Sequence, residues 1–312
     1  MRQRGPLVTV SEDRVGYEIV DVFTDRPFCG NQLAVVPDAE GLSTGQCQAL
    51  AREFGYSETA FPSSRVRDGR EYATRIFTPE QEIPFAGHPT LGTAWVLRSR
   101  GLLTAPDCVQ VCGAGAIEVR FEGADVELSA VPRDLAGPVD RDLVGDLLRL
   151  VGLSLSDLAG QGWVAGCGLS FVHLPVTEEA VARAVPTSRP FGALTQRLAA
   201  VGPAEDLLDA LHLYAVAGSA PRLEVHSRVF VPGVGVPEDP ATGSAAVGLG
   251  MALVASGLLP EGGRYNITQG VEMGRPSALK GRVEACAGRA TRCHVAGQVQ
   301  HVASGQITLP PR

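Results

Sequence analysis

Three short motifs occur twice along this 312-residue chain, in the same order. Each motif combines apolar or small residues with a proline, and the pairs are Gly30–Pro37 with Gly168–Pro175, Arg75-Ile-Phe-Thr-Pro79 with Arg228-Val-Phe-Val-Pro232, and His88-Pro-Thr-Leu-Gly-Thr-Ala94 with Asp239-Pro-Ala-Thr-Gly-Ser-Ala245. Chance similarity between common strand and turn patterns is the alternative explanation. Three matches in one order favour a duplicated unit, because self-similarity along a chain is the signature of repeated structure. We therefore predict two similar halves.

The regular structure predicted within each half is mostly β-strand. Runs of β-branched and aromatic residues bounded by turn residues predict strands at 17–23, 33–36, 72–77, 117–121, 171–176, 223–231 and 267–271. An amphipathic helix is predicted over 43–54, capped by Ser43 or Thr44. Segments 90–97 and 243–254 are apolar nearly all round, which is typical of helices buried on every side. The predicted fold is α+β, with two pseudo-symmetric domains that each wrap a curved, mostly antiparallel, barrel-like sheet around a central helix.

The boundary between the halves is predicted in the segment 129–138, which is rich in proline and glycine. We predict a flexible leader over 1–16, an N-terminal domain over 17–135 and a C-terminal domain over 136–312. The last strand either stays in the second domain or returns to the first.

Charge and hydropathy narrow the partners that this chain is expected to have. The formal net charge of −7 disfavours nucleic acid, because binding to phosphates requires a basic surface. The first 16 residues hold no apolar run long enough for a signal peptide or a membrane helix. We predict a cytoplasmic protein whose partner is a small molecule, with neither nucleic acid nor a membrane involved.

Cysteine and lysine usage disfavours metals and several cofactors. Seven scattered cysteines suit reduced thiols, and Cys108 and Cys112 lack a second ligand pair at a zinc-like interval. Lys280 is the single lysine in the sequence and sits in a polar turn, which disfavours pyridoxal phosphate and a nucleotide-binding P-loop. Gly113 and Gly115 form a lone GxG without the third glycine of a dinucleotide motif. The predicted site therefore uses no metal and no cofactor.

The starts of the two buried helices are candidate anion sites, because the first amide groups of a helix lack partners and its dipole is positive there. Gly87 allows close approach of a ligand, and Thr93 or Ser244 can offer a hydroxyl. The repeat places His88 and Asp239 at equivalent positions, so we expect them to face each other across a cleft. In the alternative interpretation, Asp239 only caps its helix and His88 only satisfies a backbone carbonyl.

Glu58 is the candidate general acid and base. It stands in Tyr56-Ser-Glu-Thr-Ala-Phe61, where enclosure by Tyr56, Ala60 and Phe61 would remove it partly from water and raise its pKa. No acidic residue holds the matching place in the second copy. The sequence therefore predicts proton transfer from one wall of the cleft.

These motifs together resemble the phenazine-biosynthesis PhzF-like isomerase family, whose members have the diaminopimelate epimerase-like fold. The resemblance runs from about residue 17 to about residue 282 and is carried by Gly30-Asn-Gln-Leu-Ala-Val-Val36, Ser57-Glu-Thr-Ala-Phe61, Phe85-Ala-Gly-His-Pro-Thr-Leu-Gly92, Asp239-Pro-Ala-Thr-Gly-Ser244 and Gln269-Gly-Val-Glu-Met-Gly-Arg-Pro-Ser277. It implies a homodimer in which Glu58 moves a proton, while His88, Asp239 and Ser244 hold polar groups of the substrate. The amides of Gly87 and Gly243 would bind there too. We also assign Asn31 and Thr242, which stand in the matched motifs, to substrate binding.

Two positions depart from the pattern of that family. Gln32 replaces the usual proline, and the segment before Glu58 reads Glu53-Phe-Gly-Tyr56 instead of the more frequent asparagine-bearing version. The second departure lines the site and bears on substrate identity. The related diaminopimelate epimerases and proline racemases use two thiols, and neither helix-start motif here contains cysteine.

The leading functional prediction is a cofactor-independent isomerase that moves a proton between carbons of a small, cyclic, carboxylate-bearing amino acid derivative in biosynthesis. An epimerase or racemase of a small amino acid is a second prediction, with His88 or Asp239 as the second acid. A dimeric ligand-binding protein of the same fold, without turnover, is the third.

Overall fold

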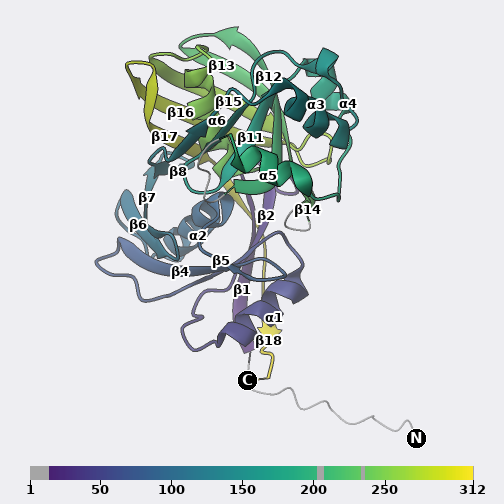
Figure 1. Ribbon diagram of the computed structural model, residues 1–312. Coiled ribbons are helices and arrows are strands. Elements are labelled where there is room, and N and C mark those ends of the chain that lie inside the picture. The colour runs from purple at the N-terminus through teal and green to yellow at the C-terminus, as the bar shows by residue number, and fades with distance from the viewer. Residues whose placement is uncertain (1–13, 202–206, 233–235, 312) are drawn as a thin grey trace, which may run out of the picture.

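The computed structural model describes residues 14–201, 207–232 and 236–311, and shows two lobes joined by several strands (Figure 1). Residues 1–13, most of the predicted leader, lie outside the described residues. The first strand already begins at Arg14, three residues before the predicted domain start at Tyr17.

The first half of the chain contains nine strands and two helices among its described residues. They are β1 (Arg14–Val22), β2 (Asn31–Val35), α1 (Thr44–Phe54), β3 (Thr59–Pro62), β4 (Glu71–Phe77), β5 (Glu82–Ile83), α2 (Gly87–Ser99), β6 (Asp107–Cys112), β7 (Gly115–Glu122), β8 (Asp125–Ala130) and β9 (Asp134–Ala136).

The second half contains the remaining helices and strands of the described residues. They are α3 (Arg141–Leu150), the 3₁₀ helix η1 (Leu155–Asp157), β10 (Trp163–Gly166), β11 (Ser170–Pro175), α4 (Glu178–Arg183), α5 (Ala193–Ala199), β12 (Leu207–Ser219), β13 (Arg222–Val231), β14 (Val236–Asp239), α6 (Gly243–Ala255), β15 (Gly262–Gln269), β16 (Ser277–Cys286), β17 (Arg289–Gly297) and β18 (Val299–Thr308).

Strand pairing shows that the two halves are copies of one unit. In the first half β1–β2, β3–β4, β6–β7 and β7–β8 pair antiparallel, while β2–β3 and β4–β6 pair parallel. In the second half β10–β11, β12–β13, β15–β16 and β16–β17 pair antiparallel, while β11–β12 and β13–β15 pair parallel. Antiparallel and parallel pairings follow one another in the same order in both halves, which confirms the predicted pseudo-symmetric α+β fold with mostly antiparallel sheets.

Each half ends on a strand that pairs with the other half. β9 follows β8 but pairs with β10, and β18 follows β17 but pairs with β1 over nearly its whole length. Figure 1 shows β18, in yellow, beside β1, in purple. The predicted domain boundary after residue 135 falls inside β9.

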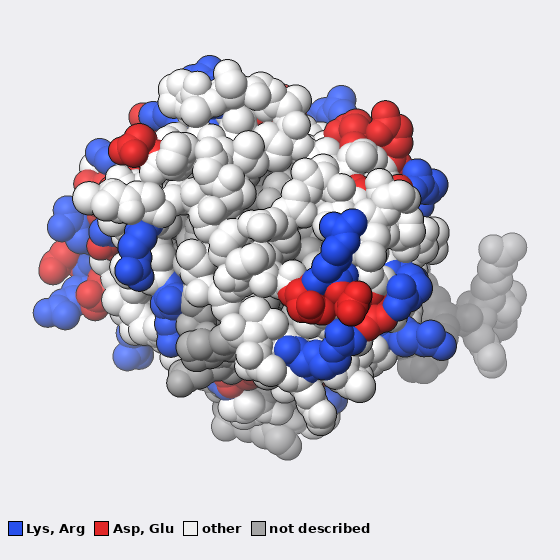
Figure 2. Space-filling view, turned by 45° about the horizontal axis from the view of Figure 1, so that its top comes forward, with Lys and Arg blue, Asp and Glu red and all other residues white. Residues whose placement is uncertain are grey.

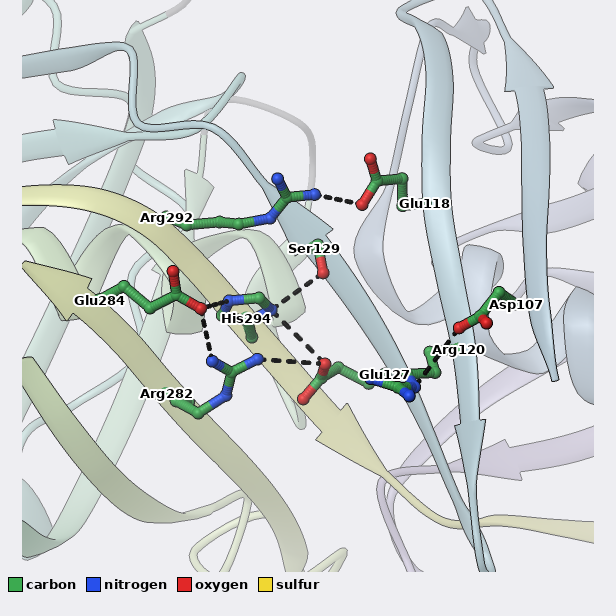
Figure 3. Close-up of polar contacts among 9 residues, drawn as sticks. All are labelled: Asp107, Glu118, Arg120, Glu127, Ser129, Arg282, Glu284, Arg292 and His294. Atoms are coloured by element: carbon green, nitrogen blue, oxygen red, sulfur yellow. Dashed lines mark hydrogen bonds and ion pairs between the residues drawn. The ribbon is translucent and has the colours of Figure 1, made fainter.

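The pairing of β8 with β17 forms a seam between the halves, from Ala130 opposite Cys293 to Val126 opposite Gly297. A polar cluster crosses this seam (Figure 3). His294 contacts Ser129 through Nδ1 at 2.9 Å and Glu284 through Nε2 at 3.1 Å. On the surface, Figure 2 shows acidic and basic side chains beside one another around a broad uncharged area.

Helices α2 and α6 are the central helices of the two halves. Nearly all of their residues are buried, and Leu91 and Leu97 of α2 belong to the same apolar core as Leu249 and Leu253 of α6. The wide apolar surface of each helix explains this position, because only enclosure by strands on all sides removes it from water. The predictions of two buried helices and of α1, which is capped by Ser43, are confirmed.

The repeated Arg-x-Phe motif has a structural role that its sequence did not reveal. In the first half Arg75 of β4 forms two hydrogen bonds to Glu82 of β5, at 2.8 and 2.6 Å. In the second half Arg228 of β13 makes the same two bonds to Glu238 of β14, at 2.7 and 2.8 Å. Each guanidinium also lies over the phenylalanine two residues later in the chain. The motif therefore fixes the short strand that leads into each central helix.

The two ion pairs differ in burial and predict different losses of stability. The side chains of Arg228 and Glu238 are 3% and 5% exposed, whereas those of Arg75 and Glu82 are 37% and 40% exposed. We expect Arg228→Met to lower the free energy of unfolding by about 3–5 kcal/mol, because it leaves a buried carboxylate unpaired. Arg75→Met, the matched control, should cost less than about 1 kcal/mol. Urea denaturation measures both, and equal losses would contradict this account.

Candidate active site

Asn31 and Glu58 meet because they begin neighbouring parallel strands. Asn31 is the first residue of β2, Glu58 directly precedes β3, and these strands pair in parallel with Ala34 opposite Thr59. Parallel neighbours start at the same edge of a sheet. Helix α1 ends at Phe54 and is capped by Gly55, whose φ of 66° lies in the left-handed region that favours glycine, and the chain then turns directly into Glu58.

Glu58 faces His88, the second residue of α2. The distance from Glu58 Oε2 to His88 Nε2 is 3.5 Å, and the side chains are 18% and 5% exposed. Both atoms are buried, and neither makes a hydrogen bond within the described part of the chain. Buried polar atoms are nearly always paired in proteins, so two facing atoms that lack hydrogen bonds mark a place where a ligand can bind.

The Asn31 side chain connects the two halves of the site. Its amide nitrogen donates to Asp239 Oδ1 and to the Ala241 carbonyl, both at 2.9 Å, and lies 3.3 Å from His88 Nδ1. The two shorter contacts use both hydrogens of the amide. His88 Nδ1 can therefore keep its own hydrogen, and we assign the tautomer in which the unprotonated Nε2 faces Glu58.

Asp239 is held from both sides rather than capping its helix. Its Oδ1 accepts from Asn31 and its Oδ2 accepts from the Thr242 hydroxyl at 2.6 Å. Gln269 donates to the Asp239 carbonyl and to Thr242 Oγ1 at 2.8 and 3.0 Å. Thr242, which we predicted to bind substrate, has its hydroxyl occupied in positioning Asp239. Gln269 was not predicted as a site residue, although it begins one of the motifs that carry the resemblance.

The first turns of α2 and α6 touch each other. A Cβ atom added to Gly87 would lie 3.0 Å from Gly243 Cα and 3.1 Å from Ser244 N, and one added to Gly243 would lie 3.3 Å from Gly87 Cα. The N-cap residues, Ala86 and Thr242, supply no side-chain hydrogen bond to either helix. Two positive helix ends without capping side chains thus converge on one place, which suits a carboxylate.

The ionisable groups of the site have pKa values that burial has moved. Burial raises the pKa of Glu58 to about 8, and the negative charge of Asp239 adds to this rise. Burial also raises the pKa of Asp239 to about 6, with hydrogen bonds from Thr242 and Asn31 opposing it. Burial lowers the pKa of His88 to about 3. Near neutral pH the site therefore holds a protonated Glu58, an ionised Asp239 and a neutral His88.

The prediction that His88 and Asp239 occupy equivalent positions in the two halves was wrong. The helices begin at Gly87 and Gly243, which makes Ser244 the counterpart of His88. Asp239 ends β14 and corresponds to Ile83 at the end of β5. His88 and Asp239 are nevertheless brought together, because Asn31 contacts both. Thr93, predicted as an alternative hydroxyl, is fully buried in the second turn of α2.

A cavity of about 300 Å³ lies beside this site. Gly243 and Ser244 line it, together with Phe85 from the segment before α2. Glu58, His88 and Asp239 do not line it. The described residues contain no group of three or more side chains suited to a metal ion and no helix long and apolar enough to cross a membrane.

The close contact of the helix starts gives a prediction for Gly87→Ala. The added methyl group meets backbone of α6, so the helices must separate, and we expect about 1–3 kcal/mol of lost stability together with a drop in ligand affinity. Gly41→Ala is the control, because a Cβ there meets nothing within 4 Å. Thermal unfolding and ligand titration measure the two effects. An unchanged Gly87→Ala protein would contradict the geometry.

The raised pKa of Glu58 predicts a pH-dependent stability. A carboxyl whose pKa is higher in the folded state adds stability below its ordinary value of 4.5, and this contribution is lost as the pH rises through about 8. The Glu58→Gln variant has no ionisable carboxyl at this position, so it does not lose stability in this way as the pH rises. Between pH 5 and pH 9 we expect it to gain about 4 kcal/mol relative to the wild type, because most of the pKa difference between 4.5 and about 8 is expressed over this range, and denaturation at each pH measures the gain. The exposed Glu53→Gln should track the wild type throughout.

Comparison with known proteins identifies relatives over almost the whole chain. Residues 20–305 match the PhzC-PhzF family, described as phenazine biosynthesis-like protein. Trans-2,3-dihydro-3-hydroxyanthranilate isomerase of Pseudomonas chlororaphis is 34% identical over 298 residues, which cover 94% of this chain and 99% of that protein.

Solved structures share the fold. A PhzF-family phenazine biosynthesis protein from Bacillus anthracis superposes with a TM-score of 0.80 at 22% identity, covering 94% of this chain and 99% of that one. A probable proline racemase from Agrobacterium radiobacter gives a TM-score of 0.61 at 13% identity, covering 95% and 94%. The architecture common to these proteins is the epimerase-like fold predicted from the sequence.

Proposed function

Because the chain belongs to the phenazine biosynthesis-like PhzC-PhzF family of isomerases, we propose that Glu58 alone moves a proton between two carbons of a small cyclic amino acid derivative, without a cofactor. The observation that carries this proposal is the isolated pair of Glu58 Oε2 and His88 Nε2, which face each other at 3.5 Å and make no hydrogen bond within the described residues. The sequence motifs predict the same family.

Substrate binding in this proposal uses the charges of the site. The carboxylate of the substrate accepts hydrogen bonds from the amides at the starts of α2 and α6 and from the hydroxyl of Ser244. Asp239, ionised at neutral pH, binds the amino group. An ammonium beside Asp239 cancels the negative charge that helps to raise the pKa of Glu58, so substrate binding favours ionisation of Glu58.

Proton transfer then needs one carboxyl group. Ionised Glu58 accepts the proton from an sp³ carbon next to a conjugated system, and the electron pair moves into that system. The protonated Glu58 returns the proton to another carbon on the same face. A pKa near neutrality suits both steps, since the group must accept and release a proton with similar ease. His88 stays neutral and limits the orientation of the Glu58 carboxyl.

The relatives support a substrate class rather than a single compound. Those named trans-2,3-dihydro-3-hydroxyanthranilate isomerase act on a ring that carries an amino group and a carboxylate. We propose a substrate of this class, turned over in biosynthesis by a cytoplasmic homodimer. The Glu53-Phe-Gly-Tyr56 segment before Glu58 is where this chain can differ from its relatives in substrate choice.

The test is isomerisation of trans-2,3-dihydro-3-hydroxyanthranilate in deuterium oxide, followed by proton NMR. We expect the wild type to shift the double bond and to incorporate solvent deuterium in those turnovers in which the protonated Glu58 exchanges with solvent before it returns the proton. Glu58→Gln should lose at least about 10³-fold in rate. Glu80→Gln, at an exposed carboxyl in the turn between β4 and β5, is the matched control and should keep full activity.

Other outcomes would replace the proposal. Inversion of a stereocentre without a shift of the double bond would indicate an epimerase. Tight binding without turnover or exchange would indicate a ligand-binding protein. Full activity of Glu58→Gln would remove Glu58 from the mechanism.

A further inference from the structure

The cavity beside Ser244 has walls that are mainly apolar and come from both halves of the chain. Apolar side chains from the segment before α2, from β7 and β8, from the loop before β11 and from α6 form these walls, and they include Phe85, Ile117, Leu128, Leu169 and Val247. An apolar wall of this extent suits a hydrocarbon group rather than the carboxylate and amine already assigned to the helix starts and Asp239.

Two charged residues border the cavity on the solvent side. Arg292 of β17 and Glu118 of β7 form an ion pair between the two halves, and Figure 3 shows the side chains reaching toward each other. Their side chains are 36% and 66% exposed. Because each charge has its partner, this border offers little to a charged ligand group. Arg133, which also lines the cavity, likewise takes part in an interaction within the protein.

The position of the cavity relates it to the proposed reaction. Gly243 and Ser244 belong both to its lining and to the helix start at which the carboxylate binds. Glu58, which moves the proton, His88, which orients it, and Asp239, which binds the amine, do not line the cavity. The cavity is therefore additional space next to the reacting ring, and its volume of about 300 Å³ lies at the lower end of the range for small-molecule sites.

We propose that the substrate of this protein carries an uncharged apolar substituent on its carboxylate-bearing ring and that this substituent fills the cavity, limited outward by the Arg292–Glu118 pair. The inference rests on the proposed function, from which it takes the position of the carboxylate. The proposed substrate is therefore a bigger molecule than an unsubstituted cyclic amino acid.

Calorimetric titration of the full chain with benzoate and with 2-, 3- and 4-phenylbenzoate tests this. At least one phenylbenzoate should bind about tenfold more tightly than benzoate, because the added ring leaves water for an apolar wall. Ala116 is an exposed residue of β7 that lines the cavity. A tryptophan side chain there should fill the cavity, so Ala116→Trp should remove the gain in affinity of the phenylbenzoate over benzoate. The affinity for benzoate itself should stay within about twofold. Ala303→Trp, at an exposed alanine of β18, is the matched control and should keep the gain.

The outcomes separate this inference from the proposed function, which the deuterium experiment tests without these ligands. Binding of benzoate with no gain for any phenylbenzoate would overturn the inference and leave the isomerase proposal standing. A gain that survives Ala116→Trp would place the substituent elsewhere and overturn it too. Failure of the wild type to bind benzoate would remove the carboxylate position on which the inference rests.

Discussion

The first turns of α2 and α6 approach so closely that a methyl group on Gly87 or Gly243 would lie 3.0–3.3 Å from facing backbone. Two helix dipoles point their positive ends at one place, an arrangement that is unfavourable unless the surrounding structure enforces it. The fold does so through the β8–β17 seam and through β9 and β18, each of which pairs with the opposite half. The architecture and the candidate anion site are thus consequences of the same contact.

Duplication gave both halves one framework, and divergence then gave them different chemistry. The Arg–Glu pair that fixes β5 is exposed, whereas its counterpart on β14 is buried, and Arg228 also donates to the carbonyls of Val181 and Ala184 at the end of α4. This extra anchoring lies next to Asp239, the residue that β14 brings to the site. The second half is therefore built to hold a fixed carboxylate, while the first half supplies Glu58 from the short segment between α1 and β3.

Local patterns in the sequence predicted what depends on local physics. The apolar surfaces of α2 and α6, the capped helix α1 and the enclosed Glu58 could all be read from neighbouring residues. Helix α3 was missed although Asp140 caps it and Leu143, Leu147 and Leu148 follow at helical spacing. The five-residue error in aligning the helix starts arose because Pro-x-x-Gly occurs in both copies at different distances from the helix. Contacts such as Gln269 with Asp239 join distant segments and leave no local pattern.

The charge balance of the site supports the zwitterionic substrate that we propose. Two uncapped helix starts attract a carboxylate, and ionised Asp239 attracts an ammonium, so an amino acid neutralises both attractions without adding net charge. Glu58 stays protonated while the site is empty because burial and Asp239 both disfavour a second negative charge. In the proposed mechanism, the ammonium group of the substrate neutralises Asp239 and so removes one of these two causes when Glu58 must act as a base. Binding energy and proton transfer are then coupled through Asp239, which touches no reacting carbon in this scheme.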